Sequence, residues 1–163
     1  MRSWAERNYE LAALFNPSFC GLILHSCVVH YQKQDVRGIP FPTTFLLLPI
    51  ILSRPLRDSL PKTARTPFHL WIDREPYIKI GLARRASNLS QITREALLFL
   101  LRQKRVTVEK ARIRKGKSIR GIPDFASNTP EMSELLESAR ILGNMFGKVP
   151  DTDDIFLSFG VTV

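Results

Sequence analysis

In this chain of 163 residues, one segment indicates how the N-terminal part folds: Leu14-Phe15-Asn16-Pro17-Ser18-Phe19-Cys20-Gly21-Leu22. Its centre, Asn16 followed by Pro17, is a helix start signal, because asparagine caps free N–H groups and proline fits the first helical turn. The helix that we predict over 17–33 is apolar on nearly every side, so it should lie at the centre of the fold. The same pair ends a preceding helix, which the apolar spacing predicts over 3–14.

A second apolar segment begins at Gly38-Ile39-Pro40-Phe41-Pro42 and runs into Phe45–Leu52. Residues that precede a proline avoid the helical region, so 37–42 is predicted as an extended loop. A helix should follow through Leu52, bent at Pro49. The eight residues of Phe45–Leu52 are far fewer than the roughly 20 that span a bilayer, so we expect a core helix and no membrane contact.

The middle of the chain combines helix signals with one strand signal. Thr66-Pro67 predicts the start of a short helix, and a further helix is predicted over 76–88. Ser87-Asn88-Leu89-Ser90 predicts a tight break before a helix over 91–103. Alternating apolar and polar residues over 106–114 then predict a β-hairpin. Helix, tight turn, helix and hairpin is the layout of a winged helix-turn-helix.

The C-terminal part predicts two more helices, one over 129–145 and a short one that begins at Asp151 or Thr152 and ends at Gly160. The predicted fold class is therefore α+β and mainly helical, with a winged-helix-like centre that carries one basic hairpin. We expect a single domain over 1–163. Its parts are N-terminal apolar helices (1–60), the winged-helix-like centre (66–121) and a C-terminal helical tail (129–163).

The formal net charge of +9 is unevenly distributed. A basic block over 102–120 contains Glu109 as its single acid, whereas 121–163 is acidic. Such a block binds phosphates by counterion release, and its lack of aromatic residues disfavours single-strand binding by stacking. Docking on an acidic protein and plain solvation are the alternatives. The predicted DNA-binding residues are Arg102, Lys104, Arg105, Lys110, Arg112, Arg114, Lys115, Lys117 and Arg120.

Two cysteines and two histidines, at Cys20, His25, Cys27 and His30, share one predicted helix. Four tetrahedral zinc ligands cannot converge from a straight helix, so no metal site is predicted. The two cysteines lie about 10 Å apart on such a helix, which is too far for a disulfide. Buried thiols are typical of a reducing compartment, and we expect a cytoplasmic protein.

No group of residues predicts catalysis or a cofactor. The acids of Asp151–Asp154 could be a metal cluster, but carboxylates at a helix start also cap free N–H groups, which accounts for them without a metal. The chain shows no glycine-rich phosphate loop and no nucleophile paired with a base. We therefore expect a protein that is not an enzyme.

The amount of bulky apolar sequence suggests more apolar surface than one small core can enclose. Exposed apolar patches of this kind mark protein interfaces. The alternative is that all of these side chains are buried internally. The predicted partner-binding residues are Phe15, Phe41, Phe45, Phe156 and Phe159.

Four segments of the chain carry a resemblance: residues 14–22, residues 38–52, Arg94-Glu95-Ala96-Leu97 and Ile155-Phe156-Leu157-Ser158-Phe159-Gly160-Val161. In their order and their residues they resemble the middle component of bacterial ABC three-component conflict systems. That class includes Lamassu-type anti-phage defence. The resemblance implies a non-catalytic adaptor that joins an SMC-like ABC ATPase to a toxic effector, commonly a nuclease. The basic hairpin could in addition contact double-stranded DNA.

A free-standing winged-helix DNA-binding regulator is the alternative function. It would need polar, base-reading side chains on the helix over 91–103. That helix is apolar through its middle, which leaves Arg94 and the C-terminal cations and weakens direct readout of bases.

Overall fold

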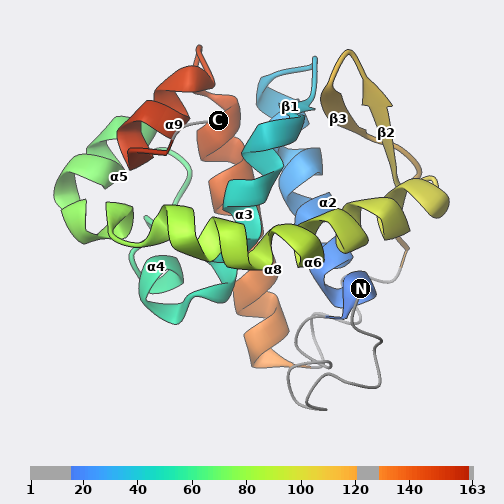
Figure 1. The fold of residues 1–163 in the computed structure, drawn as a ribbon, viewed down its shortest axis with the longest axis horizontal. Coiled ribbons are helices and arrows are strands. Elements are labelled where there is room, and N and C mark those ends of the chain that lie inside the picture. Colours follow the sequence, from blue (N-terminus) through green and yellow to red (C-terminus); the bar gives the residue numbers. More distant parts are fainter. Residues whose placement is uncertain (1–15, 121–128, 162–163) are drawn as a thin grey trace.

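The computed structural model describes residues 16–120 and 129–161 (Figure 1). Helices dominate, and three short strands form an antiparallel sheet at one side, so the mainly helical α+β class is confirmed. The helix predicted over 3–14 lies outside the described residues. The elements are α2 (Pro17–Gln34), β1 (Ile39–Pro40), η2 (Phe41–Thr43), α3 (Thr44–Leu52), α4 (Arg54–Asp58), α5 (Phe68–Arg74), η3 (Pro76–Lys79), α6 (Leu82–Arg102), β2 (Val106–Glu109), β3 (Arg112–Lys115), α8 (Pro130–Gly147) and α9 (Asp153–Phe159).

Helix α2 begins where the sequence predicts. The Asn16 side chain accepts a hydrogen bond from the Ser18 N–H at 2.8 Å, and Pro17 occupies the first helical position. The helix is central: α8, α6 and α3 all pack against it. Its buried residues lie on several sides, which agrees with a helix that is covered by neighbours in more than one direction.

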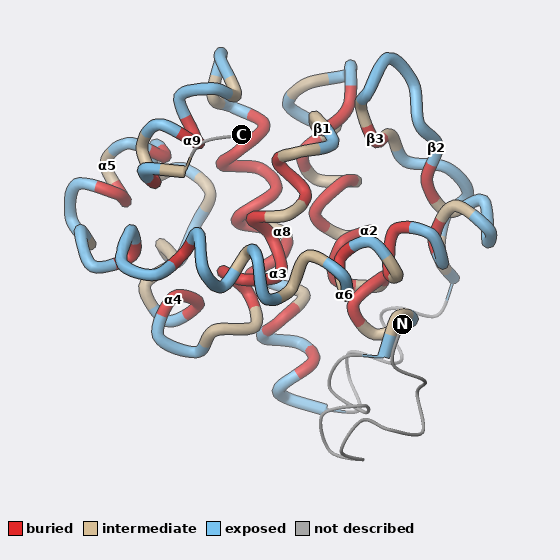
Figure 2. The backbone as a smooth tube through the Cα atoms, viewed as in Figure 1, coloured by how far each residue is buried: buried red, intermediate tan, exposed pale blue. Residues whose placement is uncertain are grey.

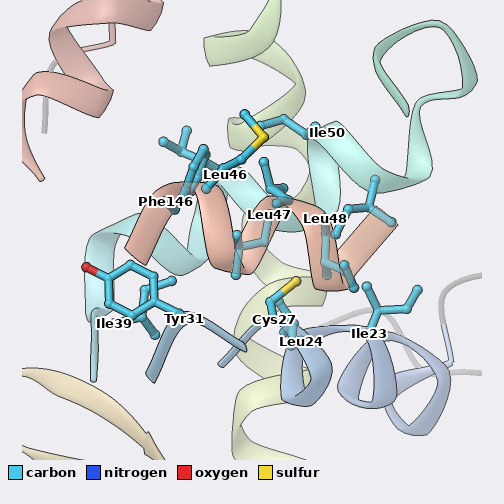
Figure 3. Close-up of a cluster of buried hydrophobic side chains, with 14 of the residues drawn as sticks. Ile23, Leu24, Cys27, Tyr31, Ile39, Leu46, Leu47, Leu48, Ile50 and Phe146 are labelled. Carbon is cyan, nitrogen blue, oxygen red and sulfur yellow. The ribbon is translucent and has the colours of Figure 1, made fainter. Parts of the chain in front are cut away.

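Helix α3 forms the other half of the core. Residues 46–51 are all buried, including Pro49 inside the helix, so the core helix predicted here is confirmed. Figure 3 shows Leu46, Leu47 and Leu48 lying above Ile23 and Leu24 of α2. The apolar run 46–51 therefore belongs to this chain's own core, whereas Phe41 is 41% exposed and Leu157 is 75% exposed, so internal burial is not complete among the described residues.

Helix α4 lies between Leu52 and Thr66, a stretch for which the sequence predicts no helix. It carries Arg57, whose Nε donates to Glu134 of α8 at 2.9 Å and whose Nη1 donates to the Ile51 carbonyl at 2.9 Å. A buried guanidinium with two such partners fixes α4 against α3 and α8. These partners are distant in sequence, so local patterns could not predict them.

Helix α6 corrects the sequence prediction. It runs without interruption from Leu82 to Arg102, so the tight break predicted at 87–90 is wrong, and the expected helix-turn-helix is not formed there. Ser87 and Asn88 are exposed, whereas Leu97 is buried. Figure 2 shows exposed and buried stretches alternating along α6. Serine and asparagine cost only a few tenths of a kcal/mol in a helix, which burial of the apolar face outweighs.

The start of the predicted helix over 76–88 is also interrupted. Residues from Pro76 to Lys79 form the short 3₁₀ helix η3, and Gly81, at φ 73°, then separates it from α6. Glycine adopts this left-handed conformation without the steric cost that a β-carbon adds. The chain therefore changes direction at 80–81 and not at 87–90.

The predicted hairpin is confirmed as β2 and β3, and β1 adds a third strand in the order β1-β3-β2. Ile39 pairs with Ile113, and both are buried, which attaches the sheet to the core. Lys110 and Ala111 form the two-residue turn with φ values of 49° and 58°. Type I′ turns require positive φ at both positions, where residues other than Gly, Asn and Asp cost roughly 1–2 kcal/mol each.

The C-terminal helices agree with their start and stop signals. Helix α8 begins at Pro130, and Gly160, at φ 65°, ends α9. Asp151 Oδ1 accepts the Asp153 N–H at 3.0 Å, so this acid has the capping role that the sequence allowed. Phe159 is buried against Phe68, with ring centroids 5.5 Å apart.

Candidate functional site

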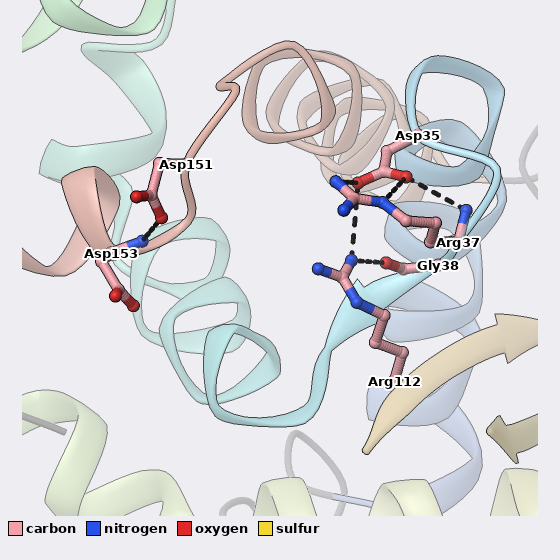
Figure 4. A network of polar contacts seen from close by, with 6 residues as sticks. All are labelled: Asp35, Arg37, Gly38, Arg112, Asp151 and Asp153. Carbon is pink, nitrogen blue, oxygen red and sulfur yellow. Dashed lines mark hydrogen bonds and ion pairs between the residues drawn. The ribbon is translucent and has the colours of Figure 1, made fainter. Parts of the chain in front are cut away.

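Some of the arginines in the basic block are already bound to other groups of the chain. Arg112 on β3 donates to the Gly38 carbonyl at 2.7 Å and to Asp35 Oδ2 at 3.4 Å. Arg37 binds the same carboxylate with two hydrogen bonds, from Nε at 2.9 Å and from Nη2 at 2.8 Å (Figure 4). Asp35 therefore anchors two guanidinium groups that lie far apart in the sequence.

Two further arginines of the block have internal partners. Arg114 forms an ion pair with Glu109 across the hairpin, and Arg105 donates to the Ser118 carbonyl. Arg105, Arg112 and Arg114 are half-buried, which agrees with a role in holding the hairpin to α2 and to its own strands. Their predicted DNA contact stays a prediction.

The remaining six cations of the block are exposed, and within residues 16–120 and 129–161 none of them forms an ion pair. They lie at the two ends of the hairpin, with Lys110 at the tip and the others around the base. Because their charge is not paired with an acid among the described residues, they add net positive charge to the hairpin. These exposed cations are Arg102, Lys104, Lys110, Lys115, Lys117 and Arg120.

The electrostatics of Asp35 explain why the anchor is firm. Its hydrogen bonds from Arg37 lower the pKa of the carboxyl below its usual value, and the charge of Arg112 lowers it further, against the opposing effect of burial. The carboxylate is therefore ionised throughout the neutral pH range. The two arginines keep their positions under those conditions.

A cleft of about 350 Å³ lies between the turn at 35–38 and the tip of the hairpin. Arg37, Lys110, Arg112 and Arg114 line it, with Glu109 as the lining carboxylate. Arg37 belongs to none of the predicted sites, because it is 65 positions before the start of the basic block in the sequence. Only the tertiary structure brings it to the hairpin.

His25 lies behind the base of the hairpin and is buried, with 4% of its surface exposed. Neither ring nitrogen has a hydrogen-bond partner among the described residues. Burial lowers the pKa of His25, and the nearby charge of Arg105 lowers it further, although the Lys117 backbone acts in the opposite direction. His30 contacts the Ser26 carbonyl at 2.8 Å, and burial lowers its pKa as well.

Both cysteines are buried in α2 and their thiols are protonated at neutral pH. Burial raises the pKa of Cys20 to about 12 and raises that of Cys27 still further. A protonated, enclosed thiol is a poor nucleophile and a poor metal ligand. The structure thus gives these residues a packing role.

An apolar groove of about 340 Å³ occupies a different face, between the start of α3, the first half of α6 and the C-terminal segment. Three of the predicted partner-binding residues, Phe41, Phe45 and Phe156, line it together. Phe41 and Phe45 pack edge to face with ring centroids 5.2 Å apart, and Phe41 is 41% exposed. The guanidinium of Arg94 lies 5.9 Å from the centroid of the Phe45 ring.

The floor of this groove consists of small α6 residues that sequence reasoning missed, namely Ala83, Ala86, Ser87 and Ser90. They recur every three or four positions, a helical spacing that was obscured by the expected break. Two predicted partner-binding residues lie elsewhere. Phe159 is buried in the aromatic cluster with Trp71 and Phe146, and Phe15 is outside the described residues.

None of the helices in the described part of the chain has the length and apolar character that crossing a membrane requires.

Among known proteins, the model of one family matches the chain. It is described as the ABC-three component (ABC-3C) system Middle Component 3 and aligns with residues 4–163. No curated protein and no solved structure matches the chain.

Proposed function

Because the chain belongs to the family of ABC-three component system Middle Component 3, we propose that it is a non-catalytic adaptor between an ABC ATPase and a toxic effector. The family match over residues 4–163 is the observation that carries this proposal. Within it, the ATPase is of the SMC-like type, the effector is a nuclease or another toxic domain, and the system serves anti-phage defence of the Lamassu kind.

An adaptor needs at least two separate contact surfaces, and the chain offers two that differ in chemistry. The apolar groove lies beside α9 and the first half of α6. The basic hairpin lies beyond the other end of α6 (Figure 1). The groove and the cleft at the hairpin tip share no lining residue, but they adjoin each other, because the Phe41 N–H donates to the Ala111 carbonyl of the hairpin turn at 2.9 Å. Two macromolecules bound there would lie side by side. We assign the groove to a protein subunit and the basic hairpin to DNA.

The ABC ATPase is the proposed occupant of the groove, because it is the component after which these systems are named. The small residues on the floor of the groove allow a partner backbone to approach closely, and Phe41 at its edge supplies exposed aromatic area. Arg94 adds a positive charge beside the ring of Phe45. The matching partner segment is therefore apolar, with an acidic residue next to Arg94.

The test is co-purification of the tagged full chain with the ABC ATPase encoded beside it. We expect the wild-type chain to retain the ATPase and Phe41→Ser to weaken retention by at least tenfold, as the loss of an aromatic contact residue usually does. Tyr77→Ser is the matched control, because Tyr77 is a similarly exposed aromatic residue, at 44%, that does not line the groove.

Three results would contradict the proposal. Absence of any ATPase in the wild-type preparation would argue against the adaptor. Equal losses in the two variants would mean that the groove is not the docking site. If Phe41→Ser releases the effector but keeps the ATPase, the groove has been assigned to the wrong subunit.

The free-standing DNA-binding regulator has less support. Its helix-turn-helix was expected around the break at 87–90, and α6 is continuous there. The half of α6 over 91–102 packs on α2 and α3 with Ala96, Leu97 and Leu100 buried, and its exposed apolar residues, Leu98 and Phe99, have no hydrogen-bonding groups with which to read base edges. A DNA contact through the hairpin does not depend on that motif.

A further inference from the structure

The cleft between the turn at 35–38 and the hairpin tip has the composition of an anion site. Its lining contains Arg37, Lys110, Arg112 and Arg114, against one lining acid, Glu109. Even with Asp35 behind Arg37 and Arg112, the cations outnumber the carboxylates. Guanidinium groups match the geometry of phosphate oxygens and bind them with charge-assisted hydrogen bonds, so this lining suits a phosphate.

The arginines of the cleft are held in place before any ligand arrives. Arg37 is fixed by two side-chain hydrogen bonds to Asp35, and Arg112 by the Gly38 carbonyl at 2.7 Å. Each guanidinium has five N–H donors, and these bonds leave several of them unused. A ligand that binds such groups has little side-chain entropy to remove, which favours binding.

Lys110 differs from the arginines, because it has no ion pair among the described residues and occupies the tip of the hairpin. Its φ of 49° is a conformation in which Asn or Gly is favoured over Lys. The chain therefore places a cation at a position where backbone geometry alone would select another residue. Strained positions of this kind cluster at functional sites.

The unneutralised charge continues from the tip to the base of the hairpin, where Lys104 and Lys117 lie side by side through the hydrogen bond from the Lys117 N–H to the Lys104 carbonyl at 2.9 Å. Four residues of strand separate the two ends, which is about 13 Å. Duplex DNA carries one charge per about 1.7 Å of its axis, so this distance covers several phosphates. A single small anion would not use both ends.

We infer that this cleft is a phosphate-binding site for the backbone of double-stranded DNA, in which Arg37 and Lys110 contact the phosphate while Arg112 and Arg114 are positioning residues. The contact continues along the hairpin to Lys104 and Lys117. The inference deepens the DNA contact of the proposed function and does not depend on ATPase docking in the groove. Recognition is independent of base sequence, because backbone phosphates carry no sequence information.

The experiment measures fluorescence anisotropy of a labelled 20-base-pair duplex with the full-length chain at salt concentrations from 50 to 200 mM. Lys110→Asn is the main variant, because Asn suits the left-handed backbone and so removes the charge without a folding penalty. Ala111→Gly changes the same turn and leaves the charge intact. Lys79→Gln removes an exposed cation from η3, which lies away from the hairpin (Figure 1).

Each lost phosphate contact makes the plot of log affinity against log salt less steep by about 0.9. The fourfold rise in salt should therefore reduce the DNA affinity of Lys110→Asn by a factor that is about 3.5 times smaller than the factor for the wild-type chain. Arg37→Gln should show the same reduction, and combining either variant with Lys104→Gln should reduce the slope further. Ala111→Gly and Lys79→Gln should match wild type. Excess inorganic phosphate at equal ionic strength should compete poorly with the duplex.

Several outcomes would overturn the inference. These are no binding by the wild-type chain, an unchanged salt slope in Lys110→Asn, or an equal loss in Lys79→Gln. Efficient competition by inorganic phosphate would identify a site for a free anion. If Lys110→Asn leaves DNA binding intact but reduces co-purification of a partner subunit, the cleft binds acidic protein. The Phe41 side chain does not line the cleft, and Phe41→Ser keeps the backbone N–H that donates to the Ala111 carbonyl of the hairpin turn at 2.9 Å, so failure of one proposal is distinguishable from failure of the other.

Discussion

Replacing Gly143 by alanine probes the contact on which the whole helical framework depends. Gly143 and Gly147 lie one turn apart on the face of α8 that packs on α2. A β-carbon at 143 would lie 2.5 Å from the Cys27 carbonyl oxygen and 3.1 Å from the Cys27 Cα. Ordinary contacts begin at 3.4 Å, so α8 would have to retreat from α2 by about 1 Å.

The expected magnitude follows from two opposing effects. Overpacking a dense interior costs about 1–3 kcal/mol, and here the obstacle is backbone that cannot rotate away. Alanine is favoured over glycine in a helix by up to about 1 kcal/mol, which offsets part of the overpacking cost. We expect a net loss of about 1–2 kcal/mol in the free energy of unfolding, which for a chain of this length lowers Tm by roughly 2–8 °C.

Thermal unfolding followed by circular dichroism measures this loss, and Gly21→Ala is the matched control. Gly21 also lies in a helix, but a β-carbon there would meet only Leu100 and Phe99 side-chain atoms at 3.4 Å. That variant should keep or raise Tm. Trimming Cys27 to alanine should not rescue Gly143→Ala, because the clash is with the carbonyl. A Tm for Gly143→Ala equal to or above that of wild type would refute the close approach of α2 and α8.

Three further predictions concern stability. Glu134→Gln removes the carboxylate that pairs with the buried Arg57, so it should lower the free energy of unfolding, measured by chemical denaturation, by about 1–3 kcal/mol. Glu137→Gln, which breaks an exposed ion pair, should lower it by less than about 1 kcal/mol. Ala111→Gly should stabilise the fold by about 1 kcal/mol, since it relieves a positive φ of 58°; an unchanged Tm would mean that the turn is not strained. Burial lowers the pKa of His25, so the unfolded state binds its proton first and stability should fall as pH falls below about 6.5. His25→Gln should flatten that pH dependence, and an unaltered slope between pH 5 and 7 would contradict it.

Packing of α8 also bears on the proposed phosphate cleft. Gln34, at the end of α2, donates to Asn144 of α8 at 2.9 Å, next to the close contact of Gly147 with the Tyr31 carbonyl. Asp35, the anchor of the cleft, follows Gln34 directly. A shift of α8 would therefore move the turn that holds Arg37, and variants at Gly143 should be tested for DNA binding as well as for stability.

Local signals predicted the elements whose ends depend on their own residues. Asn16-Pro17 predicted the start of α2 and Gly160 the end of α9, and the helix predicted over 129–145 is found as α8, from Pro130 to Gly147. The alternating pattern over 106–114 predicted the hairpin. In each case the cap, the fixed φ of proline or the side-chain period acts within a few residues, so no distant partner is needed.

The wrong break at 87–90 shows the limit of such signals. Ser87 and Asn88 favour turns by a few tenths of a kcal/mol each, but α6 buries an apolar face against α2 and α3 along most of its length. The two-residue strand β1 could not be predicted either, because it exists only through its pairing with Ile113 of β3. Tertiary burial overrides weak local preference.

Sequence alone established a basic block, an apolar core helix and the order of the helices, because charge, hydropathy and capping are properties of neighbouring residues. The tertiary structure determined which charges remain available. It neutralises Arg112 with an acid 77 positions away, brings Arg37 to the hairpin tip, and gathers Phe41, Phe45 and Phe156 around one groove. Ion pairs and grooves form between segments that meet only after the chain folds, so their membership follows from packing and not from local pattern.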